Sequence, residues 1–173
     1  MGEPKAGIEL AGRPLISYPI AAARTAGLEP LVVAKAASVL PVLDCAIVTE
    51  PDEPTHPLAG IVAALEHVGR PIVAIACDLP LLPPDLLAEL ASSSAPLAMP
   101  ANPRPQPLVA RYSPELLPRL HAALVMDEPL VKLAAELGGH TIATSRLRDY
   151  GDPEAIFANA NDPAELRRIE QLL

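Results

Sequence analysis

The sequence predicts an α/β fold with a doubly wound, mostly parallel sheet, and three observations lead to this prediction. Short apolar runs alternate along the chain with longer amphipathic segments, which is the pattern of strands joined by helices. The run 71–77 is apolar on both faces, as expected of a strand buried between two helical layers. This run ends at Asp78, and the carboxyl ends of strands are where open α/β sheets bind ligands.

The first half of the chain is expected to contain two helices and three strands. A segment at 7–10 leads into a helix that opens at Pro14 and runs to about residue 26. Pro19 lies inside this pattern and is expected to kink the helix. The other expected elements are strands at 30–34 and 45–49, a helix at 58–68 and the strand that ends at Asp78.

The order of the elements in the second half indicates that the later strands mix direction. We expect helices at 84–91, 114–125, 129–137 and 163–172, and strands at 96–100, 106–112, 140–144 and 155–158. Neither a repeat nor a linker is visible, so residues 1–173 are expected to form a single domain.

Composition narrows the function classes. The net charge of −8 argues against non-specific nucleic-acid binding. No apolar run is long enough to span a bilayer, and Glu3, Pro4 and Lys5 interrupt any signal peptide. Cys45 and Cys77 lie in apolar runs typical of reduced core cysteines. We therefore expect a cytoplasmic protein that acts on small molecules and binds neither nucleic acid nor membrane.

Asp78 is the first candidate functional residue. Mg²⁺ prefers one or two carboxylates together with water and substrate phosphates, and a carboxylate at the end of a buried strand can provide such a ligand. The alternative is that Asp78 only caps the turn that follows it.

Two further segments can meet a nucleotide. Lys5 follows Gly2 in a short N-terminal segment and can pair with phosphates, or it can be an exposed terminal lysine. Pro57, Leu58, Ala59 and Gly60 open a helix whose backbone N–H groups can receive a base or phosphate, or simply begin that helix.

Asn159 and Asn161 precede the last expected helix. That helix needs one cap, which Asp162 can provide. The two asparagine side chains are therefore interpreted as ligand contacts.

Taken together, these segments resemble the molybdenum cofactor guanylyltransferases and the wider family of related NTP transferases. The matching pieces follow the order of the family and cover nearly the whole chain. They are Met1-Gly2-Glu3-Pro4-Lys5, Leu10-Ala11-Gly12-Arg13-Pro14-Leu15, Pro57-Leu58-Ala59-Gly60, Ala76-Cys77-Asp78-Leu79-Pro80, Leu82-Pro83-Pro84-Asp85-Leu86, Gln106-Pro107 and Phe157-Ala158-Asn159-Ala160-Asn161-Asp162-Pro163-Ala164-Glu165-Leu166.

The resemblance implies a Rossmann-like nucleotidyltransferase fold, a Mg²⁺ cofactor, and transfer of GMP from GTP to molybdopterin cofactor with release of pyrophosphate. By this match Lys5 and Asp78 are catalytic, Asp78 and Asn161 hold the metal, and Gln106, Asn159 and Asn161 contact the acceptor. Gly2, Lys5 and the segment from Pro57 to Gly60 bind the nucleotide.

The sequence also departs from the family pattern. Relatives begin with a strand and a Leu-Ala-Gly-Gly loop before the Met-Gly match, so the first strand is expected to be missing here. His56 stands where relatives usually have glycine, and Lys35 stands where they often carry an asparagine near the base. Transfer of CMP or of another nucleotide to a cofactor, and an inactive nucleotide- or cofactor-binding homologue, therefore stay open. A glycosyltransferase is disfavoured because Asp78 has no second aspartate in an Asp-x-Asp pattern.

Overall fold

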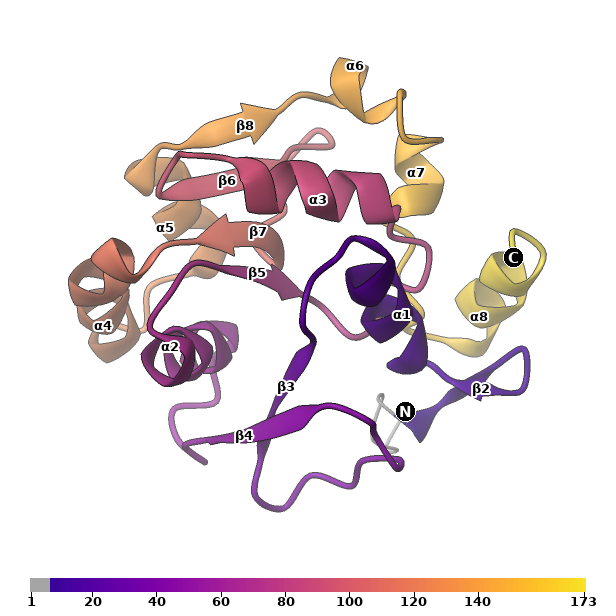
Figure 1. The fold of residues 1–173 in the computed structure, drawn as a ribbon, viewed down its shortest axis with the longest axis horizontal. Helices are drawn as coiled ribbons and strands as arrows, with labels where there is room; N and C mark the ends of the chain where they lie inside the picture. The colour runs from indigo at the N-terminus through magenta and orange to yellow at the C-terminus, as the bar shows by residue number, and fades with distance from the viewer. Residues whose placement is uncertain (1–6) are drawn as a thin grey trace.

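The computed structural model describes residues 7–173 (Figure 1). In chain order its elements are β1 (Glu9–Leu10), β2 (Arg13–Pro14), α1 (Ser17–Thr25), β3 (Leu31–Lys35), β4 (Ala46–Glu50), α2 (Pro57–Val68), β5 (Ile72–Ile75), α3 (Pro84–Ser92), β6 (Leu97–Pro100), β7 (Val109–Tyr112), the 3-10 helix η2 (Pro114–Leu116), α4 (Leu117–Val125), α5 (Leu130–Leu137), β8 (His140–Ile142), α6 (Thr144–Leu147), α7 (Pro153–Ile156) and α8 (Pro163–Glu170).

The strands form an α/β fold, as expected, but the sheet is interrupted. β3 pairs with β4 in parallel. The larger sheet has the order β5-β7-β6-β8, in which β7 is antiparallel to both neighbours and β6 is parallel to β8. The expected mixing of directions in the second half is therefore confirmed. Among the described residues, no strand pairs with the second edge of β3 or of β5.

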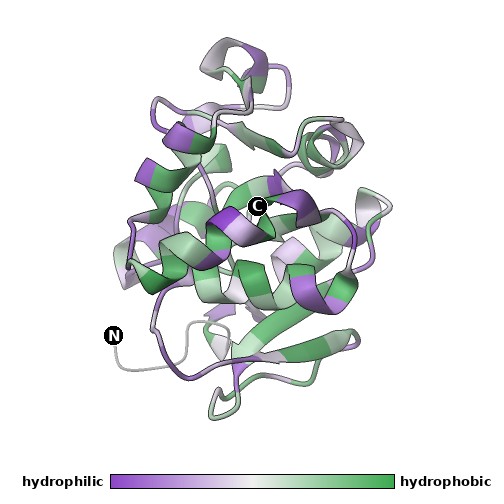
Figure 2. Ribbon diagram, turned by 90° about the vertical axis from the view of Figure 1, so that its left-hand side faces the viewer, coloured by the Kyte–Doolittle hydropathy of each residue, from purple (hydrophilic) through white to green (hydrophobic). Residues whose placement is uncertain are grey.

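Helices cover both faces of the larger sheet, and the alternation of side chains along its strands divides the core between them. On β7, Ala110 and Tyr112 join a cluster with residues of α2, α4 and α5. Val109 points the other way, into a cluster with residues of α3, α6 and α7. Figure 2 shows helices with hydrophilic and hydrophobic residues on different faces, as expected for this layering. No helix within residues 7–173 has the length and apolar character needed to cross a membrane.

The first helix begins later than the sequence predicts. Residues before it form a hairpin, in which β1 pairs with β2 and the N–H of Leu15 donates to the carbonyl of Ile8 (2.7 Å). Gly12, with φ +73°, makes the turn of this hairpin. Because α1 starts at Ser17, Pro19 lies in its first turn, where proline needs no N–H partner. The expected kink inside the helix is therefore wrong.

The strand expected at 155–158 is also wrong. Ala155 and Ile156 belong to the one-turn helix α7, and no residue of 155–158 is in a strand. The Asp152 side chain caps this helix by accepting from the N–H of Glu154 (3.1 Å), and Pro153 occupies the first helical position. An aspartate followed by proline is a helix-start signal that outweighs the β propensity of a short apolar run.

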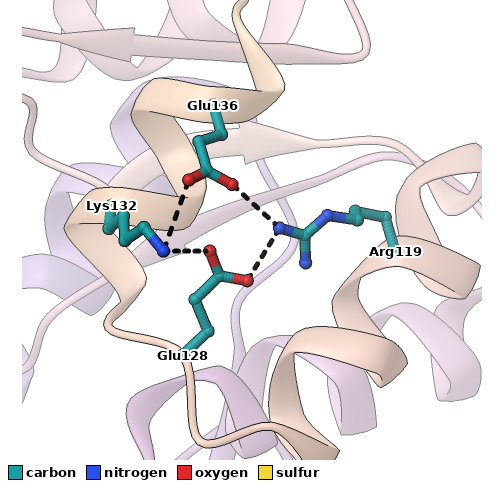
Figure 3. Close-up of polar contacts among 4 residues, drawn as sticks. All are labelled: Arg119, Glu128, Lys132 and Glu136. Carbon is teal, nitrogen blue, oxygen red and sulfur yellow. Dashed lines mark hydrogen bonds and ion pairs between the residues drawn. The ribbon is translucent and has the colours of Figure 1, made fainter.

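Four charged side chains tie α4 to α5 (Figure 3). Arg119 on α4 donates to Glu128 (2.7 Å) and to Glu136 (3.2 Å). Lys132 pairs with the same two carboxylates, at 3.6 and 3.5 Å. The Glu128 side chain is only 10% exposed. The hydrogen bond from Arg119 is the largest cause that lowers the pKa of Glu128.

We predict that Arg119→Gln destabilises the fold in a pH-dependent way. Because the folded-state pKa of Glu128 is lowered, its contribution is complete above the ordinary glutamate value of about 4.3 and is lost as pH falls through the lowered value. Urea unfolding of parent and variant should therefore differ at neutral pH and converge in acid. Arg167→Gln, on the exposed surface of α8, is the matched control. A difference that is equal at both pH values would contradict this role for Glu128.

Candidate active site

The chain after β5 and the loop before α8 meet at one edge of the larger sheet. The carbonyl of Asp78 accepts a hydrogen bond from the N–H of Ala160 (3.0 Å). Ala160 is fully buried and packs with Leu10 and Ile169. The backbone thereby fixes residues 159–161 beside Asp78, although about eighty positions separate them in the sequence. The structure thus brings together three of the residues predicted for the site.

Two acidic side chains bind the free N–H groups at the start of α8. Asp162 Oδ1 accepts from the N–H groups of Ala164 (2.7 Å) and Glu165 (2.9 Å). Glu165 Oε2 reaches back and accepts from the N–H of Asn161 (3.1 Å). Asp162 is therefore the cap, as expected. Asn159 and Asn161 are both exposed.

Gln106 lies in the loop between β6 and β7, at the same edge. Its N–H donates to Pro100 and its carbonyl accepts from Val109, both at 2.9 Å. The carbonyl of Leu108 accepts from Ala76 (2.9 Å), which holds this loop beside the segment that leads to Asp78. The buried hydroxyl of Tyr112 donates to the carbonyl of Pro107 (2.8 Å), and burial raises the pKa of Tyr112. The loop that carries Gln106 is therefore fixed at both ends.

The start of α2 is arranged differently from the expectation of open N–H groups. His56 is the N-cap, and its Nδ1 accepts from the N–H of Leu58 (3.0 Å). The N–H of Ala59 donates to the carbonyl of His56 (2.9 Å). The side chains of Leu58 and Ala59 are buried in the core, whereas Pro57 and Gly60 line a groove between β3 and β5. Of these four residues, Pro57 and Gly60 are thus the ones that line this groove.

Lys35 fixes the loop in front of α2, a role that the sequence does not reveal. Its Nζ donates to Thr55 Oγ1 (3.0 Å) and to the carbonyl of Asp52. Lys35 ends β3 in register with Glu50, which ends β4. A Cβ on Gly60 would lie 3.0 Å from Glu50 Oε2, so the Glu50 carboxylate lies against the first turn of α2. Because β3 and β4 are parallel and in this register, Lys35 and Glu50 lie side by side at the carboxyl ends of their strands.

The side-chain oxygens near Asp78 are of the kind that binds Mg²⁺ when substrate phosphates provide further ligands. No group of three His, Cys, Asp or Glu side chains forms a metal centre within residues 7–173. A half-buried carboxylate beside an asparagine loop offers oxygen donors of the kind Mg²⁺ takes, with nucleotide phosphates and water completing its shell. Gly2 and Lys5 lie outside the described residues.

Polar loops gathered at the carboxyl end of β5 lie where open α/β sheets bind their ligands. The family model described as MobA-like NTP transferase domain matches residues 1–142. The chain therefore belongs to the MobA-like NTP transferases, a family of nucleotidyltransferases.

Sequence relatives carry consistent names. A molybdenum cofactor guanylyltransferase from Albidiferax ferrireducens is 35% identical over 138 residues, which are 66% of this chain and 60% of the relative. A molybdenum cofactor guanylyltransferase from Shewanella amazonensis is 29% identical over 99% of this chain and 89% of its own length. The match thus spans three fifths of the first relative and most of the second.

Solved structures show the same fold. Molybdopterin-guanine dinucleotide biosynthesis protein A from Archaeoglobus fulgidus superposes with a TM-score of 0.80 at 21% identity, covering 99% of this chain and 91% of that one. The 2-C-methyl-D-erythritol 4-phosphate cytidylyltransferase from Thermus thermophilus gives a TM-score of 0.71 at 19% identity, covering 98% and 93%. The Rossmann-like nucleotidyltransferase fold expected from the sequence is thereby confirmed.

We predict that His56→Ala destabilises the chain by roughly 1 kcal/mol, because α2 loses its N-cap acceptor. His56→Asn should cost less, since an asparagine side chain can accept from the same N–H group. Chemical denaturation of the two variants beside the parent measures this difference. Equal stability of all three proteins would show that the bond between Nδ1 and Leu58 contributes nothing.

Proposed function

We propose that this protein transfers GMP from GTP to molybdopterin cofactor and releases pyrophosphate. The observation that carries the proposal is the meeting of Asp78 with residues 159–161 at the carboxyl end of β5, in a chain that belongs to the MobA-like NTP transferases. The names of the two sequence relatives support guanine and the molybdenum cofactor as substrates. We expect the reaction to occur in the cytoplasm, in one domain formed by residues 1–173.

In the proposed reaction a phosphate oxygen of the acceptor attacks the α-phosphorus of GTP. The bond from that phosphorus to the bridging oxygen breaks, and pyrophosphate leaves with the electron pair. A phosphate nucleophile is already ionised at neutral pH, so no general base is needed. Positioning and charge stabilisation then provide most of the rate.

The proposed roles combine the positions of the described residues with what the family resemblance implies. Asp78 and Asn161 hold Mg²⁺, which when bound supplies positive charge to the reacting phosphates. Gln106 and Asn159 orient the acceptor from the two loops that flank Asp78. Pro57 and Gly60 border the base, and Gly2 and Lys5 contact the nucleotide phosphates, as the family resemblance implies.

Transfer of CMP is the second candidate reaction, and two observations support it as an alternative. Lys35 is engaged by Thr55 and Asp52 and occupies the position where a base-reading asparagine is expected. The Thermus cytidylyltransferase shares the fold. Assaying the acceptor product with each of the four NTPs and Mg²⁺ distinguishes the two. The GMP adduct is expected, and a CMP adduct would assign the cytidylyl reaction instead.

We predict that Asp78→Asn lowers the rate of transfer by about hundredfold or more, the scale of losing one group that stabilises transition-state charge. Circular dichroism and the melting temperature should stay close to the parent values. Asp127→Asn is the matched control, because Asp127 lies on the exposed turn between α4 and α5 with φ +50°, which asparagine also tolerates. Turnover of Asp78→Asn at the parental rate would refute the metal assignment.

We predict that substitutions of the neighbouring residues Asn161 and Asp162 have opposite effects on activity and stability. Asn161→Ala is expected to lower transfer more than about tenfold while costing less than the ~1 kcal/mol of a lost cap. Asp162→Ala should do the opposite, because Asp162 supplies the cap of α8. Thermal melts and initial rates of both variants give the comparison. A large stability loss with near-normal activity in Asn161→Ala would reverse this assignment.

A further inference from the structure

A second cavity lies between α2, the end of α4 and the segment that joins β4 to α2, and is called here the α2–α4 cavity. Its volume is about 230 Å³. The two helices lie side by side (Figure 1). None of the residues that line this cavity also lines the groove between β3 and β5. The cavity is therefore separate from the candidate active site, and its role does not depend on the proposed function.

The α2–α4 cavity has an apolar floor and an acidic rim. Ala59 and Val62 of α2 are buried, whereas Glu53 and Glu66 are exposed. No Lys or Arg of residues 7–173 lines the cavity, and its remaining titratable group is the imidazole of His121. The apolar residues that line it are Pro51, Pro54, Ala59, Val62, Ala63 and Leu124.

The two carboxylates at the rim are not neutralised by a permanent positive charge. Glu66 Oε1 lies 3.0 Å from Nε2 of His121, and Glu53 Oε2 accepts from the N–H of Thr55 (3.2 Å). Neither carboxylate pairs with a Lys or Arg of the described chain, unlike the glutamates between α4 and α5 (Figure 3). Two unneutralised carboxylates at one rim attract a cationic group.

The size of the cavity favours a single side chain as its occupant. Small-molecule sites typically have volumes of about 300–1,000 Å³, so this cavity is small for a whole metabolite. An apolar floor below a charged rim suits an arginine, whose methylene stem packs on apolar surface while its charged head stays near water.

The surface beside the cavity is suited to contact with a protein. Leu124 lines the cavity, and the next two residues, Val125 and Met126, are 88% and 76% exposed. Exposed apolar side chains next to one another are typical of protein interaction surfaces. Arginine side chains that fill pockets are common anchors in such interfaces.

We propose that the α2–α4 cavity binds one arginine side chain of a partner protein, whose neighbouring apolar residues cover Val125 and Met126. The guanidinium group donates to Glu53 and Glu66, which approach it from two different segments. Its planar fork of five N–H donors can bond two carboxylates at once. The methylene stem lies against Val62 on the floor.

The test uses the 173-residue chain and three end-capped probes, which are Arg alone, Leu-Arg-Leu and Leu-citrulline-Leu. Citrulline has nearly the shape of arginine but is uncharged. In an NMR titration, Leu-Arg-Leu should shift the amide signals of Ala63 and Glu66 and bind about tenfold or more tightly than the citrulline peptide, because charge-assisted hydrogen bonds are lost with citrulline. It should also bind several-fold more tightly than arginine alone, because its leucines contact Val125 and Met126.

Variants of the chain check the location. The double variant Glu53→Gln, Glu66→Gln should lower the affinity for Leu-Arg-Leu to that of the citrulline peptide, while each glutamine keeps an oxygen acceptor. Glu154→Gln, at an exposed position of α7, is the matched control and should change nothing. Met126→Ser should weaken binding of Leu-Arg-Leu but not of arginine alone.

Three outcomes would overturn the proposal. Equal affinity for the arginine and citrulline peptides would exclude recognition of the guanidinium group. Unchanged affinity in the double variant would place the peptide elsewhere. Binding of arginine alone as tightly as Leu-Arg-Leu would indicate a site for a free small molecule instead of a protein. If the double variant does not fold, the comparison of the three probes on the parent chain decides.

Discussion

β5 connects the candidate site with the core, and within residues 7–173 its backbone pairs with another strand along one edge only. Its pairing with β7 connects it to the buried centre of the larger sheet, and its side chains alternate between the two core clusters. Its carboxyl end leads to Asp78, where the loop before α8 is attached through Ala160. Its other edge opens on the groove. The candidate site therefore lies beyond the carboxyl end of β5, and the interruption of the sheet lies along its unpaired edge.

Helices hold the β3–β4 pair next to the larger sheet, since no strand of the described chain connects the two sheets. α2 contacts β3, β4 and β5, and α1 contacts α3. The positions of Lys35 and Glu50 relative to Asp78 therefore depend on side-chain packing against α2. Packing holds two elements less specifically than a ladder of backbone hydrogen bonds, because a sheet ladder also fixes the register of its strands.

Local patterns in the sequence predicted most of the elements. The apolar run before Asp78 and the amphipathic helix that ends at Gly69 both appear where expected, because burial on two faces or on one leaves a distinct periodicity. The errors arose where backbone turns overrode propensity, at the hairpin around Gly12 and at the cap Asp152. Glycine is also required at position 139, because a Cβ there would lie 2.5 Å from the carbonyl oxygen of Leu97. That requirement comes from tertiary contact and has no local signature.

The candidate site could be predicted in part for the same reason. The position of Asp78 after a strand and the cap at Asp162 are both predicted from the neighbouring regular elements, and the structure confirms Asp162 as the cap. The roles of His56, Lys35 and Tyr112 cannot be predicted from the sequence, because each depends on which backbone group comes within hydrogen-bonding distance after folding. All three hold a loop or a helix start at the site edge by a hydrogen bond to the main chain. Residues that hold the loops in place can thus be identified only from the folded structure. Residues expected to contact the ligand are predicted from their positions next to strands and helices in the sequence.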